Sequence, residues 1–281
     1  MTRRARLNLL LVLIVAGLAA IIALAPQLDA PVEVERLSSE SARAVSRIRL
    51  HTGTGGSIEL RRANGGWRLV EPLRAAANGF RVNTLLTVLG APVHTRIDAP
   101  RESLGRYGLD PPRARLELDD LEILFGDTEP IHGRRYLLYD GRVALVDDAY
   151  FSHLASSAAN YVDPALLDRD AQPSRIDLPG RSLIRDGDAW RQEPADSDAA
   201  GGDVEGLAQA WRGAEATAVR PYEPALDWRG TVRVELPGGE VTFDIARTEY
   251  EVVLGRRDLG IQYHLTKGTG ARLLGVEGGT S

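Results

Sequence analysis

The feature that most constrains this chain is a set of sequence landmarks that occurs twice in the same order. The matched positions, at offsets between 118 and 128 residues, are Ile48 with Ile176, Trp67 with Trp190, Asn78 with Asp203, Arg113–Leu118 with Thr231–Leu236, and Arg135–Leu138 with Gln262–Leu265. Self-similarity along a chain indicates a repeated structural unit and outweighs local predictions of single elements. We therefore expect two related α+β modules, over residues 47–168 and 173–281.

The pattern within each module predicts short strands joined by tight turns, with helices between them. Asn64–Gly66 is a hairpin signal between two strand-like runs, which favours mostly antiparallel sheets. Asn78 and Asp203 are expected to cap matching helices, because an apolar stripe at helical spacing follows each of them. Asp147 or Asp148 is expected to cap a further helix, for which the second module shows no counterpart. The two matching stripes are Val82, Leu85, Leu86 and Leu89, and Val204, Leu207, Ala208 and Trp211.

An apolar run near the N-terminus predicts a single transmembrane helix. Residues 7–25 contain one polar side chain, Asn8, and as a helix they would be roughly 28 Å long, close to the ~30 Å hydrocarbon core of a bilayer. Arg3, Arg4 and Arg6 precede this run, and no charged residue lies within it. By the positive-inside rule, the N-terminus is expected in the cytoplasm and the bulk of the chain in the periplasm.

The same segment is expected to stay attached as an uncleaved signal-anchor in the bacterial inner membrane. Ala23–Ala25 has the small-x-small form of a cleavage site, but Pro26 follows it directly and disfavours processing. The sequence then divides into a cytoplasmic stub and anchor over residues 1–25, a polar spacer over residues 26–46, and the two modules.

Composition excludes several classes of site. The chain has no cysteine, which rules out disulfides, thiolate metal ligands and a cysteine nucleophile. Three of the 34 basic residues precede the apolar run, so the rest of the chain has 31 against 39 acidic residues, a balance of −8. Nucleic-acid binding draws most of its affinity from clustered basic surface, so no nucleic-acid partner is expected.

A set of landmarks in the first module resembles the bacterial family called domain of unknown function 4340. The residues that carry the resemblance are Trp67, Pro72, Tyr107, Gly108, Leu109, Asp110, Pro112, Phe125, Gly126 and Tyr136. The resemblance to the family is strong over residues 47–160 and weak over the second module. Family members usually have Ala-Asp before the first helix, where this chain has Ala77-Asn78. Asparagine caps a helix as well as aspartate does, so the expected fold is unchanged.

What the resemblance implies is a role outside the membrane without catalysis. Members of that family are often single-pass envelope proteins, and some resemble auxiliary components of ABC-2 type exporters and gliding-motility-like transport systems. No catalytic residues accompany the resemblance. An ABC-type exporter component is accordingly the partner that it implies for this chain.

The histidines, the glycine-rich stretch and the aspartate pairs, which are candidates for metal, phosphate or catalytic sites, have simpler structural explanations. The histidines are His51, His94, His132, His153 and His264; none has the spacing of a helical metal pair, and all are expected at the surface. Gly53–Ser57 lacks the helix N-terminus that a phosphate loop needs, because a strand follows it. Turn and capping roles explain the pairs Asp119-Asp120 and Asp147-Asp148. The sequence therefore predicts no catalytic, cofactor-binding or metal-binding residue.

The tryptophans separate into core and surface candidates. Trp67, Trp190 and Trp211 recur at equivalent or helix-facing positions, which predicts core packing. Trp228 has no counterpart in the first module, and together with Tyr222 it is the candidate exposed contact.

These features favour a membrane-anchored accessory or scaffold protein that binds a transporter or an envelope assembly. Two alternatives stay open. One is a periplasmic hydrolase that acts on cell-wall or glycan material through carboxylates brought together by the fold. The other is a small-ligand binding module with its pocket between the two modules.

Retention of the anchor predicts that the purified protein keeps its N-terminal apolar run. N-terminal sequencing of protein recovered from membranes should give a start before residue 7. A mature start at residue 26 or later would contradict the signal-anchor prediction.

Overall fold

The computed structural model describes residues 11–20, 35–53, 56–154, 157–194 and 203–275, and the chain divides into two units, Met1–Arg36 and Leu37–Ser281. In the first unit, residues 11–20 form a helix. No helix within the described ranges has both the length and the apolar character needed to cross a membrane. The other residues of the predicted anchor, 7–10 and 21–25, lie outside the described residues.

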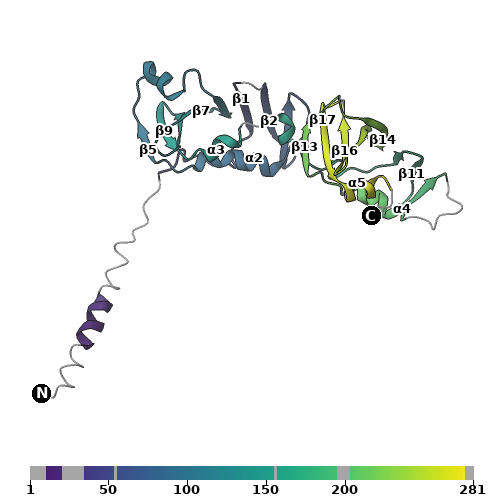
Figure 1. Cartoon of the computed structure of the whole chain (residues 1–281), viewed down its shortest axis with the longest axis horizontal. Helices are drawn as coiled ribbons and strands as arrows, with labels where there is room; N and C mark the ends of the chain where they lie inside the picture. The colour runs from purple at the N-terminus through teal and green to yellow at the C-terminus, as the bar shows by residue number, and fades with distance from the viewer. Residues whose placement is uncertain (1–10, 21–34, 54–55, 155–156, 195–202, 276–281) are drawn as a thin grey trace. The chain divides into compact units, whose positions relative to one another are not determined.

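The first part of the second unit is an antiparallel nine-stranded sheet in the order β4-β3-β2-β1-β6-β7-β8-β9-β5 (Figure 1). Its strands are β1 (Arg47–Thr52), β2 (Ser57–Ala63), β3 (Gly66–Glu71), β4 (Ala75–Ala76), β5 (Thr95–Ile97), β6 (Ala114–Leu118), β7 (Leu121–Thr128), β8 (Arg135–Tyr139) and β9 (Arg142–Val146). Its helices are α2 (Gly79–Leu86), α3 (Ala149–Ser152) and the 3-10 helices η2 (Thr87–Gly90), η3 (Arg101–Tyr107) and η4 (Ala158–Tyr161).

The second part is an antiparallel eight-stranded sheet in the order β12-β11-β10-β14-β15-β16-β17-β13. Its strands are β10 (Arg175–Leu178), β11 (Arg181–Asp186), β12 (Ala189–Glu193), β13 (Ala218–Pro221), β14 (Trp228–Leu236), β15 (Gly239–Arg247), β16 (Glu251–Arg256) and β17 (Ile261–Thr266), with helices α4 (Val204–Arg212) and α5 (Lys267–Leu273). Apart from β4, this order repeats the first sheet strand for strand, and the predicted α+β class with antiparallel sheets is confirmed.

Two details of the sequence comparison were wrong. The strand β17, which contains Gln262–Leu265, takes the place of β9 in the order, so β16 and not β17 is the counterpart of Arg135–Leu138. The second sheet also has a helix after its last long strand: α5 follows β17 as α3 follows β9, with Thr266 as its cap accepting from Thr269 N. The sequence comparison missed both because β17 (IQYHLT) shares a tyrosine and a leucine with β8 (RYLLY), whereas its true counterpart β16 (EVVLGR) has no tyrosine, and because α5 has few apolar residues.

The predicted helix caps at Asn78 and Asp203 are confirmed. The Asn78 side chain accepts a hydrogen bond from Arg81 N at 3.2 Å, and that of Asp203 accepts from Gly206 N at 2.6 Å. Each cap satisfies one of the free N–H groups at a helix start. Asp148 precedes the four-residue helix α3 but makes no side-chain cap bond; its carboxylate bonds to Arg135 instead.

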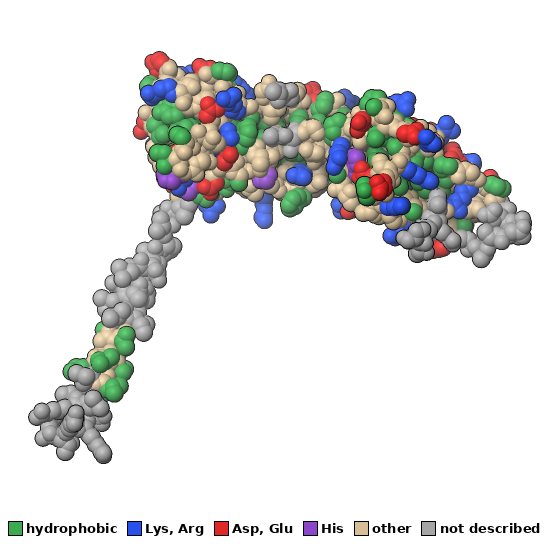
Figure 2. Space-filling view, viewed as in Figure 1, with side chains coloured by type: hydrophobic (Ala, Val, Ile, Leu, Met, Phe, Trp, Pro, Cys, Tyr) green, Lys and Arg blue, Asp and Glu red, His purple; other side chains and the backbone are tan. Residues whose placement is uncertain are grey.

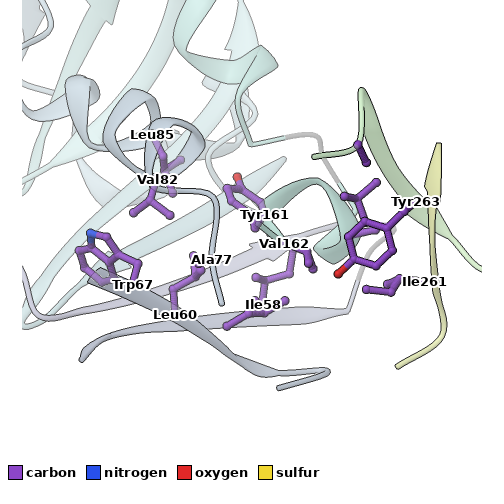
Figure 3. Packing of buried hydrophobic residues seen from close by; sticks show 14 of the residues in the cluster. Ile58, Leu60, Trp67, Ala77, Val82, Leu85, Tyr161, Val162, Ile261 and Tyr263 are labelled. Atoms are coloured by element: carbon purple, nitrogen blue, oxygen red, sulfur yellow. The ribbon is translucent and has the colours of Figure 1, made fainter. Parts of the chain in front are cut away.

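One hydrophobic core runs through both sheets. Buried residues of the two sheets and of the connection after η4 belong to a single cluster, in which Tyr161 and Val162 are 2 % exposed. Figure 3 shows Val162 between Ile58 of the first sheet and Tyr263 of the second, with Tyr161 on the side of Val82 and Leu85. The predicted core residues Trp67 and Trp211 belong to this cluster, and the half-buried Trp190 packs against it.

The residues just before β1 pack against the first sheet. Leu37 is 1 % exposed, and its N–H bonds to Ala91 O at 2.9 Å. The Ser38 hydroxyl lies 2.9 Å from the Tyr139 hydroxyl, and Val45 is 4 % exposed. The sequence assigned these positions to a polar spacer over residues 26–46, because serines and glutamates surround the two apolar anchors.

Truncation of Leu37 tests this packing. Replacing a fully buried leucine by alanine costs about 2–5 kcal/mol, so Leu37→Ala should lower the free energy of unfolding by that amount in denaturant titrations. Ile131→Ala is the matched control, since Ile131 is 81 % exposed and should change stability by less than about 0.5 kcal/mol. Equal stability of the two variants would show that residues 37–45 do not belong to the folded unit.

Candidate functional site

The family landmarks of the first module hold helix η3 against the face of the sheet that points away from the common core. Gly108 ends η3 with φ 64°, a left-handed conformation that glycine adopts without strain. A Cβ atom on Gly126 of β7 would lie 2.2 Å from the Tyr107 carbonyl oxygen, so only glycine permits this approach. Leu109 is 2 % exposed, and the rings of Tyr107 and Tyr136 lie 4.9 Å apart.

The remaining landmarks have structural positions as well. Phe125 is fully buried in the common core, whereas Pro72 and Asp110 are exposed and Pro112 is half-buried. Leu109 and Pro112 form an isolated β-bridge around the turn that contains Asp110. In the described part of the chain, these landmarks build a fold feature and do not gather reactive groups.

The outer face of the first sheet is apolar. One row of paired residues crosses it on adjacent strands: Leu124, Leu138, Val143 and Ile97. These four side chains form a small hydrophobic cluster with Leu109 beneath η3. Burial against η3 removes the row from water, which is the dominant source of stability for such a face.

The corresponding row of the second sheet is polar. It runs through Asp244 on β15, Gly255 on β16, Gln262 on β17 and Arg220 on β13. Gln262 is only 3 % exposed, although its counterpart Val143 is an aliphatic residue. A buried amide is tolerated when its donors and acceptors are satisfied, so this substitution requires specific partners.

A stacked aromatic pair covers this polar row. The rings of Tyr222 and Trp228 lie 4.8 Å apart at an interplanar angle of 7°, and both residues are half-buried. They lie against Gly255, where a Cβ atom would come within 2.6 Å of Tyr222 and 2.8 Å of Trp228. The Trp228 indole N–H donates to Glu223 O at 3.0 Å. The structure therefore brings together the two residues that the sequence marked as a contact.

Charged groups fix the polar edge of the aromatic pair. The Tyr222 hydroxyl donates to Asp244 Oδ2 at 2.8 Å, and Arg257 Nε donates to the same oxygen at 3.1 Å. The Arg257 guanidinium also lies 5.7 Å from the centre of the Tyr222 ring, and its side chain is 71 % exposed. Partial burial and the bond to Asp244 raise the pKa of Tyr222, and Arg257 opposes that shift. The hydrogen bond from Tyr222, followed by the charge of Asp244, raises the pKa of Arg257.

A second polar chain lies behind the aromatic pair. His264 Nδ1 is 2.9 Å from Glu251 Oε1, and His264 Nε2 is 3.1 Å from Gln262 Nε2. Gln262 Oε1 accepts from Glu223 N at 2.9 Å. His264 is 5 % exposed, so its predicted surface position was wrong. The segment that follows β13 covers this face, and the alternating Gln and His of β17 look like an exposed face when that cover is unknown.

Several other groups considered in the sequence form structural bonds. Asp119 accepts from Ser46 N, Ser46 Oγ and Arg47 N at 2.7–2.9 Å, and Asp147 pairs with His94 at 2.9 Å. No group of three or more potential metal ligands occurs among the described residues. On the face seen in Figure 2, acidic and basic side chains are interspersed.

A shallow polar hollow of about 440 Å³ lies beside the family landmarks. It is lined by Arg113, Asp127, Thr128, Arg135 and Phe151. Arg113 pairs with Asp127 at 2.7 Å, and Arg135 bonds to Asp148 and lies over the Phe151 ring at 3.8 Å. Both guanidinium charges are thus compensated within the protein, so the hollow offers no uncompensated charge to a ligand.

Substitution of Gly126 tests the role of the family landmarks. Gly126→Ala forces η3 away from β7, and overpacking of this kind destabilises a protein by about 1–3 kcal/mol, measurable as a lower unfolding midpoint. Gly238→Ala is the control, since a Cβ there meets no atom within 4 Å. Similar midpoints for both variants would refute the close approach of η3.

Comparisons with known proteins agree with the landmark residues. Searches of curated proteins and of solved structures each gave no match. A family model matches residues 67–228, which is more than half of the 281 residues and spans Trp67, the Tyr107–Asp110 run and Trp228. The chain therefore belongs to the family described as Domain of unknown function (DUF4340).

Proposed function

We propose that this protein is a membrane-anchored, non-catalytic component of the bacterial envelope that binds a partner through its second sheet. The contact surface is formed by Tyr222, Trp228 and Arg257. The observation that carries this proposal is the stacked aromatic pair, which is held half-exposed over Gly255 and bonded to Asp244 and Glu223.

The composition of this surface suits partner binding. Tryptophan, tyrosine and arginine are the residues most enriched among those that dominate interface energies. The stack, its two ring hydrogen bonds and the Arg257 contact order these side chains in the free protein. Ordering before association lowers the entropy lost on binding, which raises affinity without further contacts.

The partner that fits best is an integral membrane protein, and we propose an exporter component of the ABC type. The apolar run over residues 7–25, bounded by arginines on its N-terminal side, supports attachment to the inner membrane. Some members of the family resemble auxiliary components of such exporters, which is the ground for this choice of partner. A protein attached to the bilayer meets an integral membrane partner at a high effective concentration, so a modest surface is sufficient for binding.

The geometry gives less support to a periplasmic hydrolase. The buried histidine array of the described residues, Glu251–His264–Gln262, ends on an amide and not on a nucleophile. Both ring nitrogens of His264 are engaged, and its ring is buried. General acid–base catalysis requires that such a ring reach the substrate, directly or through one water.

A ligand pocket between the modules has similarly little support. At the junction, Leu166 N bonds to Ala214 O at 3.0 Å and Ala216 N bonds to Pro164 O at 2.8 Å. Tyr161 and Tyr263 fill the adjoining core. Close packing of this kind leaves no room for a ligand of ordinary size.

We further propose that the two sheets arose by duplication of one module and then diverged in function. Their shared strand order and the matched caps at Asn78 and Asp203 support common descent. The first sheet retains an apolar outer face beneath η3, and the second has exchanged that cover for the aromatic contact.

The binding surface is tested by alanine substitution in affinity purification from gently solubilised membranes. Wild-type protein should recover a stoichiometric integral membrane protein, and Trp228→Ala should reduce that recovery at least about tenfold, as expected for removal of a residue worth 2 kcal/mol or more. The matched control is Phe80→Ala, which removes an aromatic residue that is 77 % exposed in the first module. Unchanged recovery with a folded Trp228→Ala protein would contradict the proposal.

A further inference from the structure

The buried chain Glu251–His264–Gln262 defines the protonation state of His264. The Glu223 backbone N–H can only donate, so the Gln262 atom 2.9 Å from it must be the carbonyl oxygen. The amide NH2 of Gln262 then faces His264 Nε2 at 3.1 Å, and this nitrogen must be an unprotonated acceptor. His264 Nδ1 carries the single ring proton and donates it to Glu251 at 2.9 Å.

A second proton on His264 cannot be accommodated by this arrangement. It would attach to Nε2 and place an N–H group directly against the Gln262 NH2 group. Rotation of the Gln262 amide by half a turn would present its oxygen to His264, but it would also place the NH2 group against Glu223 N–H. Thus no orientation of Gln262 satisfies protonated His264 and Glu223 N–H together.

The neighbouring charged groups do not remove the contact between two donors, the protonated His264 Nε2 and the Gln262 NH2 group. Glu251 on β16 pairs with Nδ1 in either protonation state, so it favours the charged ring without relieving the Nε2 contact. On β15, Asp244 is occupied by Tyr222 and Arg257. Arg220 on β13 is paired in register with Gln262 and is exposed, and the cation adds no acceptor to the site.

The Glu223 backbone must move when His264 takes up a second proton, and this same backbone segment carries Tyr222 and Trp228. Glu223 follows Tyr222 directly, and its carbonyl accepts the Trp228 indole N–H. Loss of the Glu223–Gln262 bond therefore loosens both ends of the aromatic stack. By comparison, the β17 strand around His264 is held by full pairing with β16 and β13.

We propose that protonation of His264 releases the Tyr222–Trp228 segment from the outer face of the second sheet, so that the contact surface forms near neutral pH and is lost in mildly acidic surroundings. Histidine is the side chain whose charge ordinarily changes between about pH 5 and pH 8. The biological meaning of this switch rests on the proposed function, whereas the rearrangement itself requires no partner.

The experiment follows Trp228 by fluorine NMR in the full-length chain, labelled with 5-fluorotryptophan and kept in mild detergent. The Trp228 resonance is assigned by its loss in Trp228→Phe. Between about pH 8 and pH 5.5, the range in which a histidine titrates, it should shift in a single transition in the wild type. The transition should vanish in His264→Gln, which cannot take up a proton at that position.

Gln262→Glu is the decisive matched variant. Its carboxylate accepts from Glu223 N–H and from protonated His264 together, so the Trp228 resonance should stay at its neutral-pH position throughout the titration. A wild-type resonance that does not move, or that moves equally in Gln262→Glu, would overturn the proposal. The NMR titration contains no partner, so a negative result there does not contradict the proposed function. In the same way, failure to recover a partner in the affinity purification does not contradict the His264-dependent rearrangement.

Discussion

The rest of the structure depends on one constraint: strands β7–β9 of the first sheet and β15–β17 of the second each have two faces to remove from water. In both sheets one face is buried in the common core, which continues through Tyr161 and Val162. The opposite face of these strands needs a cover of its own, and the connection that leads into β6 or β14 supplies it. That connection forms η3 in the first sheet and the Tyr222–Trp228 segment in the second.

The two covers bury different kinds of side chain. The first covers an apolar row, and the second covers a polar row and carries the proposed contact surface. Under η3 the row beginning at Leu124 is apolar and is stabilised by burial alone. Behind Tyr222 and Trp228 the row contains Asp244 and Gln262, which are tolerated because each finds a hydrogen-bond partner. The cover of the second sheet therefore depends on directed hydrogen bonds, whereas the cover of the first depends on apolar contacts.

Sequence patterns predicted the parts that rest on local rules. The caps at Asn78 and Asp203, the antiparallel α+β class and the family followed from capping chemistry, turn signals and landmark order. The burial of His264 and its link to Gln262 could not be predicted, because both depend on which loop covers β17. The Tyr222–Trp228 contact was noticed only because it had no counterpart, and its support by Gly255 and Arg257 required the strand register.

The proposed function requires that the surface around Trp228 contacts a membrane partner. Site-specific photocrosslinking in living cells tests this, with a photoreactive residue in place of Arg229, which follows Trp228 directly in the sequence and has a side chain that is 82 % exposed. We expect a crosslink from this position to one integral membrane protein, and none from position 80, where Phe80 is 77 % exposed. Absence of an adduct at position 229, or the same adduct from position 80, would contradict it.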